Sequence, residues 1–419
     1  MQDFSAIDAE RIFMTVKDIQ GVKHPTTAPA ALDACADRIA RDMGALGLKV
    51  REQRFLVPGF PLEFRNIEGS LGPVDSEPAA VVVAHYDTVA TTLGANDDAI
   101  GIATMLEIAR VLAALPEPPP VYFVAVSLEE ENPAMFAAEH GKLRELGLVG
   151  ESGAWTGWAV AKAAKEFQAA ARNAFMGGMD YGDAWRNVLA EAAGKDAFGP
   201  AGGLAGAHGG KVAATLEDVL SCYRSIIPNY EGITTANAPG LLNRIGSDRW
   251  VRDALARGLR IAFNITLDEI GTCNHEPGSQ KSLGGINLYP LLAQSHRVDP
   301  ARASGDWSLV LADGNSGALG RLFMEKVSIP GIDLPSGFLQ LPQTFDQIAR
   351  EVPMALNSDH ANFWRHGIPA IFIFDTSTGR NPFCHSMADS VEVLDYDYVR
   401  SIAQAVAATV ADPAARAGR

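Results

Sequence analysis

AAVVVAHYDTVATTLGANDDAIGIATMLEIARVLAALPEPPPVYFVAVSLEE, residues 79–130, is the stretch that decides the fold. Its two continuously apolar runs, 79–84 and 121–126, are typical of strands buried in a parallel sheet. The segment between them, 101–115, has apolar residues at helical spacing and is followed by several prolines. This strand–helix–strand order predicts an α/β sheet covered by helices.

The flanking sequence continues the alternation in both directions. On the N-terminal side, a helix is predicted over residues 27–48, and a strand follows it. On the C-terminal side, helices are predicted over 247–258 and 396–410, with strands over 260–271 and 369–376. We therefore predict a mixed, largely parallel sheet with helices on both faces.

The stretch 132–243 differs from the rest of the chain. It is rich in alanine and glycine, predicts helices over 157–176 and 215–227, and contains the flexible run GPAGGLAGAHGG at 199–210. We interpret it as an inserted helical subdomain. The remaining residues, 1–131 and 244–419, would form one α/β domain.

The bulk composition excludes several classes of protein. Of the 419 residues, 47% are hydrophobic and 20% charged, and no apolar run is long enough to cross a membrane. A formal net charge of −15 without a basic cluster opposes nucleic acid and anionic membranes as partners. The four cysteines show no CxxC spacing, and no signal peptide is seen, so a cytoplasmic protein is expected unless a leader has been removed.

The first predicted strand ends in a histidine and an acid. His85 and Asp87 are two residues apart and so point to the same side of the strand. A carboxylate in that position can orient an imidazole that binds a metal. Taken alone, this pair more often has a purely structural explanation.

A glycine-bounded loop, GANDDAIG, opens the next helix with two acids, Asp97 and Asp98. Aspartate is a favoured helix cap, which would account for one of them. The two oxygens of the other carboxylate can bridge two cations. The sequence pattern therefore indicates one cap and one metal ligand.

Further acids and a histidine follow the other strands. Glu129 and Glu130 end the second strand and are either a hydrated surface loop or part of a site, while Asp268 and His385 follow later strands. Ligands of open α/β sheets bind beyond the carboxyl ends of the strands, where these side chains would emerge. Nitrogen and oxygen ligands without sulfur suit zinc, with manganese or cobalt as alternatives.

With these residues in place, the sequence resembles the zinc aminopeptidase family that includes bacterial leucyl aminopeptidases, aminopeptidase Y and the glutamate carboxypeptidase II group. The matching segments occur in the family's order: AHYDT, GANDDAIG, FVAVSLEE, RIGSDRWVRDALARGLRIAFNITLDEIG, PGSQ, SDHANFW and NPFCHSMADSVEVLDYDYV. The resemblance implies the three-layer αβα fold of zinc exopeptidases and a dinuclear metal site.

The resemblance also implies a ligand set. Carried over to this chain, His85, Asp97 and Glu130 would bind one metal ion, and Asp97, Asp268 and His385 the other. Asp97 would be the bridging carboxylate. Two divalent ions, most simply zinc, are therefore expected.

The remaining roles follow from the same resemblance. Glu129 matches the general base, Asp87 the partner of the metal-bound histidine, and Asp98 a neighbour or cap. The implied function is hydrolysis of peptide bonds as an aminopeptidase or other exopeptidase. The family's Gly-Ser after the glutamate pair is here Gly246-Ser247, more than a hundred residues later. Because the insertion begins directly after the glutamate pair, it would be a lid or wall at the rim of the site, and the alternative is a decoration that serves solubility or oligomer formation.

Other functions remain open at this stage. They are an amidohydrolase or deacylase acting on N-acyl amino acids or small amides, a single-zinc enzyme like glutaminyl cyclase, and a peptidase-fold binding protein without activity. All except the last would take a peptide or small amide as substrate. Side-chain preference and oligomeric state cannot be read from the sequence.

Overall fold

The computed structural model describes residues 4–150, 155–194 and 211–416. Within them the chain forms a nine-stranded mixed sheet of order β1-β2-β4-β3-β5-β9-β7-β8-β6. The strands are β1 (Lys49–Leu56), β2 (Glu63–Leu71), β3 (Ala79–His85), β4 (Val121–Val126), β5 (Ile261–Leu267), β6 (Gln294–His296), β7 (Ser308–Ala312), β8 (Ser336–Gln340) and β9 (Ala370–Phe374). The four central strands, β4, β3, β5 and β9, run parallel, so their carboxyl ends all lie at the same end of the strands.

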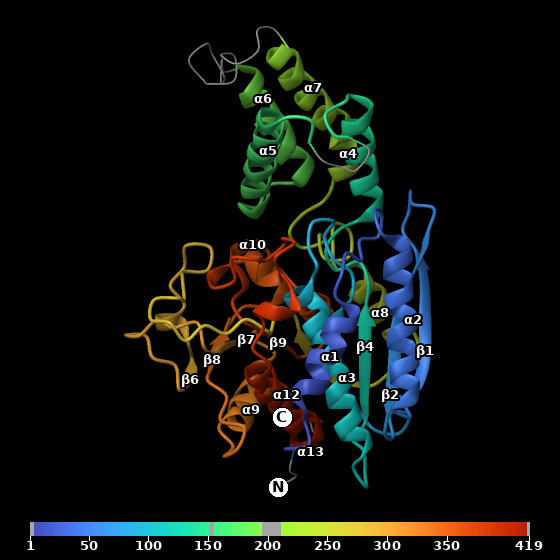
Figure 1. Ribbon diagram of the computed structural model, residues 1–419, viewed down its shortest axis with the longest axis vertical. Coiled ribbons are helices and arrows are strands. Elements are labelled where there is room, and N and C mark those ends of the chain that lie inside the picture. Colours follow the sequence, from blue (N-terminus) through green and yellow to red (C-terminus); the bar gives the residue numbers. More distant parts are fainter. Residues whose placement is uncertain (1–3, 151–154, 195–210, 417–419) are drawn as a thin grey trace.

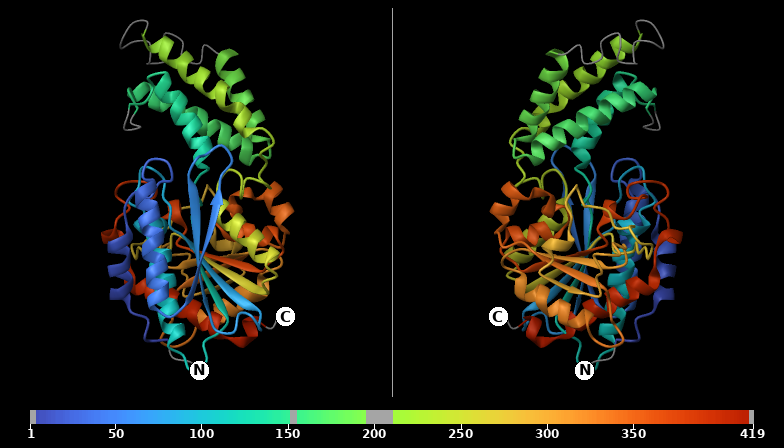
Figure 2. Two further views of the ribbon diagram at one scale, coloured as in Figure 1. Left: turned by 90° about the vertical axis from the view of Figure 1, so that its right-hand side faces the viewer. Right: turned by 90° about the vertical axis from the view of Figure 1, so that its left-hand side faces the viewer.

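Helices cover both faces of the sheet, as Figures 1 and 2 show. One face packs against α1 (Ala9–Ile19), α2 (Pro29–Ala45), α3 (Ile100–Ala113), α9 (Gly317–Val327) and α12 (Tyr396–Ala411). The other packs against α8 (Ile245–Ala256), α10 (Phe345–Glu351) and α11 (His360–Arg365). Alternate residues of β3 enter the two cores, Val82 on one side and Val81 and Val83 on the other.

The predicted fold class is confirmed: a helix-flanked mixed sheet is present. The predicted helix over 27–48 corresponds to α2, and 101–115 corresponds to α3. The sequence reasoning did not predict α1, which packs its buried Ile12 and Val16 into the core. No helix in the described ranges has both the length and the apolar character to cross a membrane.

The described residues of 133–150, 155–194 and 211–226 form helices that stand apart from the sheet at one end of the molecule (Figure 1). They are α4 (Pro133–Glu145), α5 (Trp158–Met176), α6 (Tyr181–Gly194) and α7 (Lys211–Ile226). These helices pack around a hydrophobic cluster of their own, which contains Trp185 and Tyr223. The predicted flexible run 199–210 lies outside the described residues. We call residues 132–243 the helical segment.

The helical segment leaves and rejoins the sheet at the same point. The amide of Arg244 donates to the carbonyl of Glu129 at 2.7 Å, and that of Ile245 donates to Leu128 at 2.8 Å. A Cβ on Gly246 would lie 2.0 Å from the carbonyl oxygen of Ser127, so only glycine permits this approach. Gly246-Ser247 therefore follows the glutamate pair in space, although more than a hundred residues separate them in sequence.

Candidate metal centre

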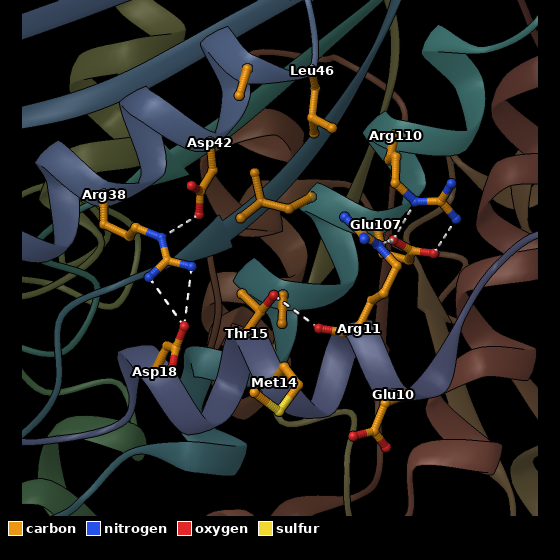
Figure 3. A pocket seen from close by; sticks show the side chains of 13 residues that line it. Glu10, Arg11, Met14, Thr15, Asp18, Arg38, Asp42, Leu46, Glu107 and Arg110 are labelled. Carbon is orange, nitrogen blue, oxygen red and sulfur yellow. Dashed lines mark hydrogen bonds and ion pairs between the residues drawn. The ribbon is translucent and has the colours of Figure 1, made fainter.

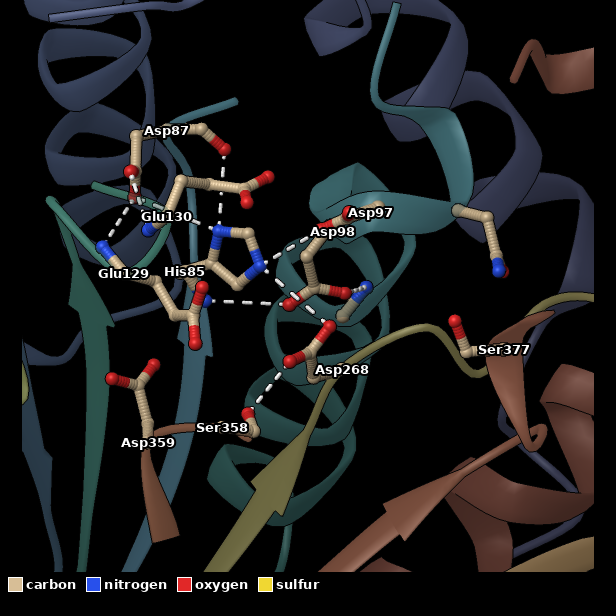
Figure 4. A network of polar contacts seen from close by, with 12 residues as sticks. His85, Asp87, Asp97, Asp98, Glu129, Glu130, Asp268, Ser358, Asp359 and Ser377 are labelled. Carbon is tan, nitrogen blue, oxygen red and sulfur yellow. Dashed lines mark hydrogen bonds and ion pairs between the residues drawn. The ribbon is translucent and has the colours of Figure 1, made fainter. Parts of the chain in front are cut away.

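The predicted site residues meet at the carboxyl ends of the central strands (Figure 4). His85 is the last residue of β3, Asp268 directly follows β5, and the loop after β4 carries Glu129 and Glu130. This convergence follows from the parallel order β4-β3-β5, because the ends of neighbouring parallel strands lie side by side.

Asp97 lies between the two histidines of the site. Its Oδ1 is 3.1 Å from Nε2 of His85, and its Oδ2 is 3.0 Å from Nε2 of His385. The Asp97 side chain is buried, whereas that of His385 is 51% exposed. The centre therefore opens to solvent on the His385 side, with Asp97 shared between two groups of ligands.

The distances correct the grouping that the family resemblance implied. Nε2 of His85 lies 3.6 Å from Oδ1 of Asp268, and His85, Asp97 and Asp268 form one cluster of potential ligands. Nε2 of His385 lies 3.5 Å from Oε2 of Glu130. Thus His85 pairs with Asp268 and His385 with Glu130, the reverse of the expected partners. Strand order alone does not decide this pairing, because β3 is the neighbour of both β4 and β5; the paths of the loops after the strands decide it.

Asp87 joins the histidine to the glutamate loop. Nδ1 of His85 is 3.2 Å from the main-chain oxygen of Asp87 and 3.5 Å from its carboxylate. The two carboxylate oxygens of Asp87 accept hydrogen bonds from the amides of Glu129 and Glu130, at 3.1 and 3.2 Å. Asp87 therefore holds the imidazole and both glutamates in position, a wider role than the expected one.

Asp98 has the supporting position expected of the second acid in the loop. It accepts hydrogen bonds from the amide of Gly101 in the first turn of α3, at 3.0 Å, and from the amide of His85, at 3.3 Å. Both oxygens are thus engaged by the backbone. The carboxylate of Asp97 points instead to the histidines, so the two adjacent acids have separate surroundings.

The centre has more buried negative charge than the protein neutralises. Burial raises the pKa of Glu129 and of Glu130, and no hydrogen bond reaches Oε1 of either side chain. Burial alone would lower the pKa of His85, but nearby carboxylates, Asp268 first, hold it well above its usual value. Because buried carboxylates without partners are unfavourable, the donor set fits one or more bound cations.

Several polar residues of the centre were not predicted. Ser358 donates a 2.6 Å hydrogen bond to Oδ2 of Asp268, and Ser247 donates to Asp359, a buried acid whose pKa burial raises to about 7. Ser358 and Asp359 belong to the segment SDHANFW, which had been matched to the family without a role for either. Their serine–aspartate contacts depend on loops far apart in sequence, so no local signal reveals them.

Arg244 was also missed. Its side chain is buried, its Nη1 lies 3.7 Å from Oε1 of Glu129, and its φ of 51° is in the left-handed region. Burial lowers the pKa of this guanidinium. A positive charge thus stands beside the predicted general base, at the residue where the chain returns from the helical segment.

Cys384 places a sulfur at the edge of the centre, against the expectation of nitrogen and oxygen ligands alone. One potential ligand atom from each of Asp97, Cys384 and His385 falls within a common 4.8 Å. Burial raises the pKa of the Cys384 thiol. In the described residues, therefore, His385 has a thiol neighbour as well as two acids.

A separate pocket is lined by α1, α2 and α3 and shares no residue with the metal centre (Figure 3). Several of its charged side chains are paired with one another: Arg38 contacts Asp42 at 2.6 Å, and Arg110 contacts Glu107 at 2.6 Å. These contacts are typical of helix surfaces in solvent, where ion pairs contribute little.

Comparison with known proteins shows what this chain resembles. The model of "Peptidase family M28" matches residues 66–169 and 338–410, which include the central strands β3, β4 and β9. These ranges contain His85, Asp97, the glutamate pair and His385. Over these residues the chain resembles peptidase family M28. Asp268 lies between the two matched ranges, and the distance of 3.6 Å between its Oδ1 and Nε2 of His85 places it beside that histidine.

Individual curated relatives match over short regions. "Uncharacterized protein YfbL" of Escherichia coli is 31% identical over 131 residues, 29% of this chain and 40% of that protein. "Aminopeptidase YwaD" of Bacillus subtilis is 47% identical over 49 residues, 12% of this chain and 11% of that protein. The chain thus matches less than half the length of these relatives.

Solved structures share the fold over nearly the whole chain. A leucine aminopeptidase precursor from Bacteroides thetaiotaomicron superposes with a TM-score of 0.52 at 17% identity, covering 98% of this chain and 99% of that chain. A glutaminyl cyclase from the same species gives 0.54 at 17% identity, covering 97% and 99%. At this identity the likeness concerns the fold, which aminopeptidases and cyclases have in common.

Proposed function

We propose that this chain is a zinc-dependent hydrolase of peptide bonds, acting as an aminopeptidase or other exopeptidase on peptides or small amides. The observation that carries the proposal is the Asp97 carboxylate, with one oxygen facing His85 and the other facing His385. In a family of peptidases, a carboxylate shared by two histidine-containing ligand groups is the arrangement that a dinuclear centre needs.

The distances support two metal positions. For zinc bound tetrahedrally by nitrogen and oxygen, ligand atoms stand about 3.4 Å apart. Around His85 the contacts to Asp97 and Asp268 are 3.1 and 3.6 Å. Around His385 those to Asp97 and Glu130 are 3.0 and 3.5 Å. Each histidine would therefore bind one zinc ion with its two acids, and Asp97 would belong to both groups.

Glu129 is the proposed general base. When bound, the metal ions polarise the scissile carbonyl and lower the pKa of a water molecule. Glu129 accepts a proton from the water and passes it to the leaving amine, which contributes about 10²–10⁴-fold to the rate. Its Oε1 has no hydrogen-bond partner, and the guanidinium of Arg244, 3.7 Å away, opposes the neutralising effect of burial.

The helical segment is the proposed wall or lid of the site, set on a catalytic domain made of residues 1–131 and 244–419. Its root is anchored: Glu131 contacts the buried His24 at 2.6 Å, and Asn132 donates to the carbonyl of Leu241 at 2.8 Å. Because these contacts begin one residue after Glu130, the segment starts at the rim of the centre. It would limit the length or shape of the substrate.

A substrate panel tests the activity. Purified protein is offered aminoacyl, N-acyl and C-terminally blocked dipeptides, and N-terminal glutaminyl peptides, with and without a chelator. We expect release of the N-terminal residue from unblocked peptides, abolished by chelation and restored by zinc. Cleavage of N-acyl substrates alone would establish the deacylase instead, and pyroglutamyl product would establish the cyclase.

Metal analysis tests the dinuclear centre independently of turnover. Zinc is counted by mass spectrometry in the wild type and in Asp97→Ala, whose missing carboxylate belongs to both ligand groups. We expect the variant to lose two zinc ions per chain. Loss of only one would contradict the shared carboxylate and favour a single-zinc centre.

A further inference from the structure

A second group of metal-binding side chains lies outside the catalytic centre, on the loop after β5. One potential ligand atom from each of Cys273, His275 and Asp395 falls within a common 4.8 Å. None of the three belongs to the proposed catalytic ligands. Cys273 and His275 follow β5, whereas Asp395 directly precedes α12, so tertiary folding brings them together.

The spacing of the sulfur and nitrogen atoms fits a single zinc ion. Sγ of Cys273 lies 3.7 Å from Nε2 of His275. Zinc–sulfur and zinc–nitrogen bonds of about 2.3 and 2.0–2.1 Å at a tetrahedral angle place these two atoms about 3.6 Å apart. The thiol and the imidazole therefore already have the separation that shared coordination requires.

The imidazole of His275 is oriented from its other side. Its Nδ1 lies 3.3 Å from Oδ2 of Asp306, and the other oxygen of Asp306 accepts a 2.8 Å hydrogen bond from Ser304. With the ring proton on Nδ1, Nε2 offers its lone pair on the side of Cys273. A carboxylate behind the ligating imidazole is the usual support of a zinc-bound histidine.

The backbone holds the three ligands in place. One oxygen of Asp395 accepts from the amide of Tyr398, which leaves the other for a cation, and the Asp395 amide donates to Gly271 at 2.9 Å. The amide of Asn274, between the cysteine and the histidine, donates to Gly305 at 2.8 Å. The loop is thus fixed to the start of α12 and to the residues that precede β7.

We propose that Cys273, His275 and Asp395 form a further zinc site, with Asp306 supporting His275. The side chain of His275 is 69% exposed, so a fourth position remains open to water. On binding, the Cys273 thiol gives up its proton to solvent and its sulfur joins the metal. The ion would cross-link the loop after β5 to α12, and this loop is hydrogen-bonded through Gly271 to Asn96, the neighbour of Asp97.

The test uses cobalt in place of zinc, because cobalt bound by a thiolate absorbs in the near ultraviolet. Cys273→Ser removes the proposed sulfur ligand, and Cys384→Ser is the matched control at the catalytic centre. We expect the wild-type chain to show the thiolate band and Cys384→Ser to keep it. Cys273→Ser should lose both the band and one metal ion per chain.

Two further variants examine the other ligands. His275→Ala should lose the same single metal ion, and Asp306→Asn should weaken its binding by about 10–100-fold. Circular dichroism confirms folding of each variant. In an Asp97→Ala background, one thiolate-bound cobalt should remain, so this test does not depend on the catalytic centre. Equal metal content in wild type and Cys273→Ser, or a band removed only by Cys384→Ser, would overturn the proposal.

Discussion

Two glutamates, the buried Glu129 and the partly buried Glu139 of the helical segment, differ in how their oxygens are used. Burial raises the pKa of both Glu129 and Glu139. In the helical segment, Glu139 accepts a 2.8 Å hydrogen bond from Gln168 and lies 3.5 Å from the hydroxyl of Tyr230. At the carboxyl end of β4, Oε1 of Glu129 has no hydrogen-bond donor. The comparison indicates that Glu139 in the segment has a structural role and that Glu129, at the carboxyl end of β4, has a functional one.

The two parts also differ in how sequence maps onto structure. The catalytic centre combines residues from 85 to 385, brought together by the sheet. The core of the helical segment uses residues between 143 and 238, from neighbouring helices. We therefore expect chemistry to depend on the sheet domain, while the segment affects access and its own local stability.

The largest expected effect is on the shared carboxylate. Asp97→Ala should remove both catalytic metal ions and lower activity by at least about a thousandfold, since metal stabilisation of the transition state amounts to several kcal/mol. The check is kcat/KM beside metal content. Asp183→Ala, an exposed acid of the segment, is the control. Near-normal activity of Asp97→Ala would contradict the assignment of Asp97 as the carboxylate shared by the two metal ions.

The same chemical change at the two glutamates sharpens the comparison directly. Glu129→Gln should keep the metal ions and lower kcat by about 10²–10⁴-fold, because an amide cannot accept the proton. Glu139→Gln should leave kcat nearly unchanged, because its hydrogen bonds are structural. Turnover and metal content are measured for both. Equal losses in the two variants would contradict the distinction between the acids.

Two buried tryptophans test the independence of the cores. Trp185 stacks on Tyr223 within the segment, and Trp250 in α8 donates to Glu68 in the sheet domain at 2.8 Å. Replacement of either by alanine should cost about 3–5 kcal/mol. Hydrogen exchange should increase in the segment alone for Trp185→Ala, with activity on a small substrate retained. Trp250→Ala should increase hydrogen exchange in the sheet domain and lower activity. Identical hydrogen-exchange patterns in the two variants would refute the presence of two separate cores.

The smallest expected effect concerns specificity. Because Asn132 contacts Leu241, a short glycine-serine linker can replace residues 134–240. The shortened chain should keep its metal ions and its activity on a dipeptide. The ratio of its kcat/KM values for short and long peptides should change about tenfold or more, because the loss of pocket contacts costs about 1–3 kcal/mol. An unchanged preference would show that the segment is not a lid.

Much of the sheet domain could be predicted because its signals are local. The apolar runs at β3 and β4 and the helical spacing of α3 determine these elements almost alone. Edge strands such as β6, three residues long with exposed side chains, lack such a signal. The first helix, α1, was missed although it has local signals: Asp8 caps its N-terminus, and its buried residues Ile12, Val16 and Ile19 stand at helical spacing.

The sequence by itself determined which residue types follow the apolar runs, namely His85, the glutamate pair and Asp268, and it placed Asp97 in the loop that opens α3. Only the tertiary structure decided how they group. That His85 faces Asp268 and His385 faces Glu130 depends on strand order and loop paths, which neither spacing nor residue type encodes. The position of Arg244 was likewise decided by the tertiary structure. Hydrogen bonds across the root of the helical segment place Arg244 beside Glu129, although more than a hundred residues separate the two in sequence.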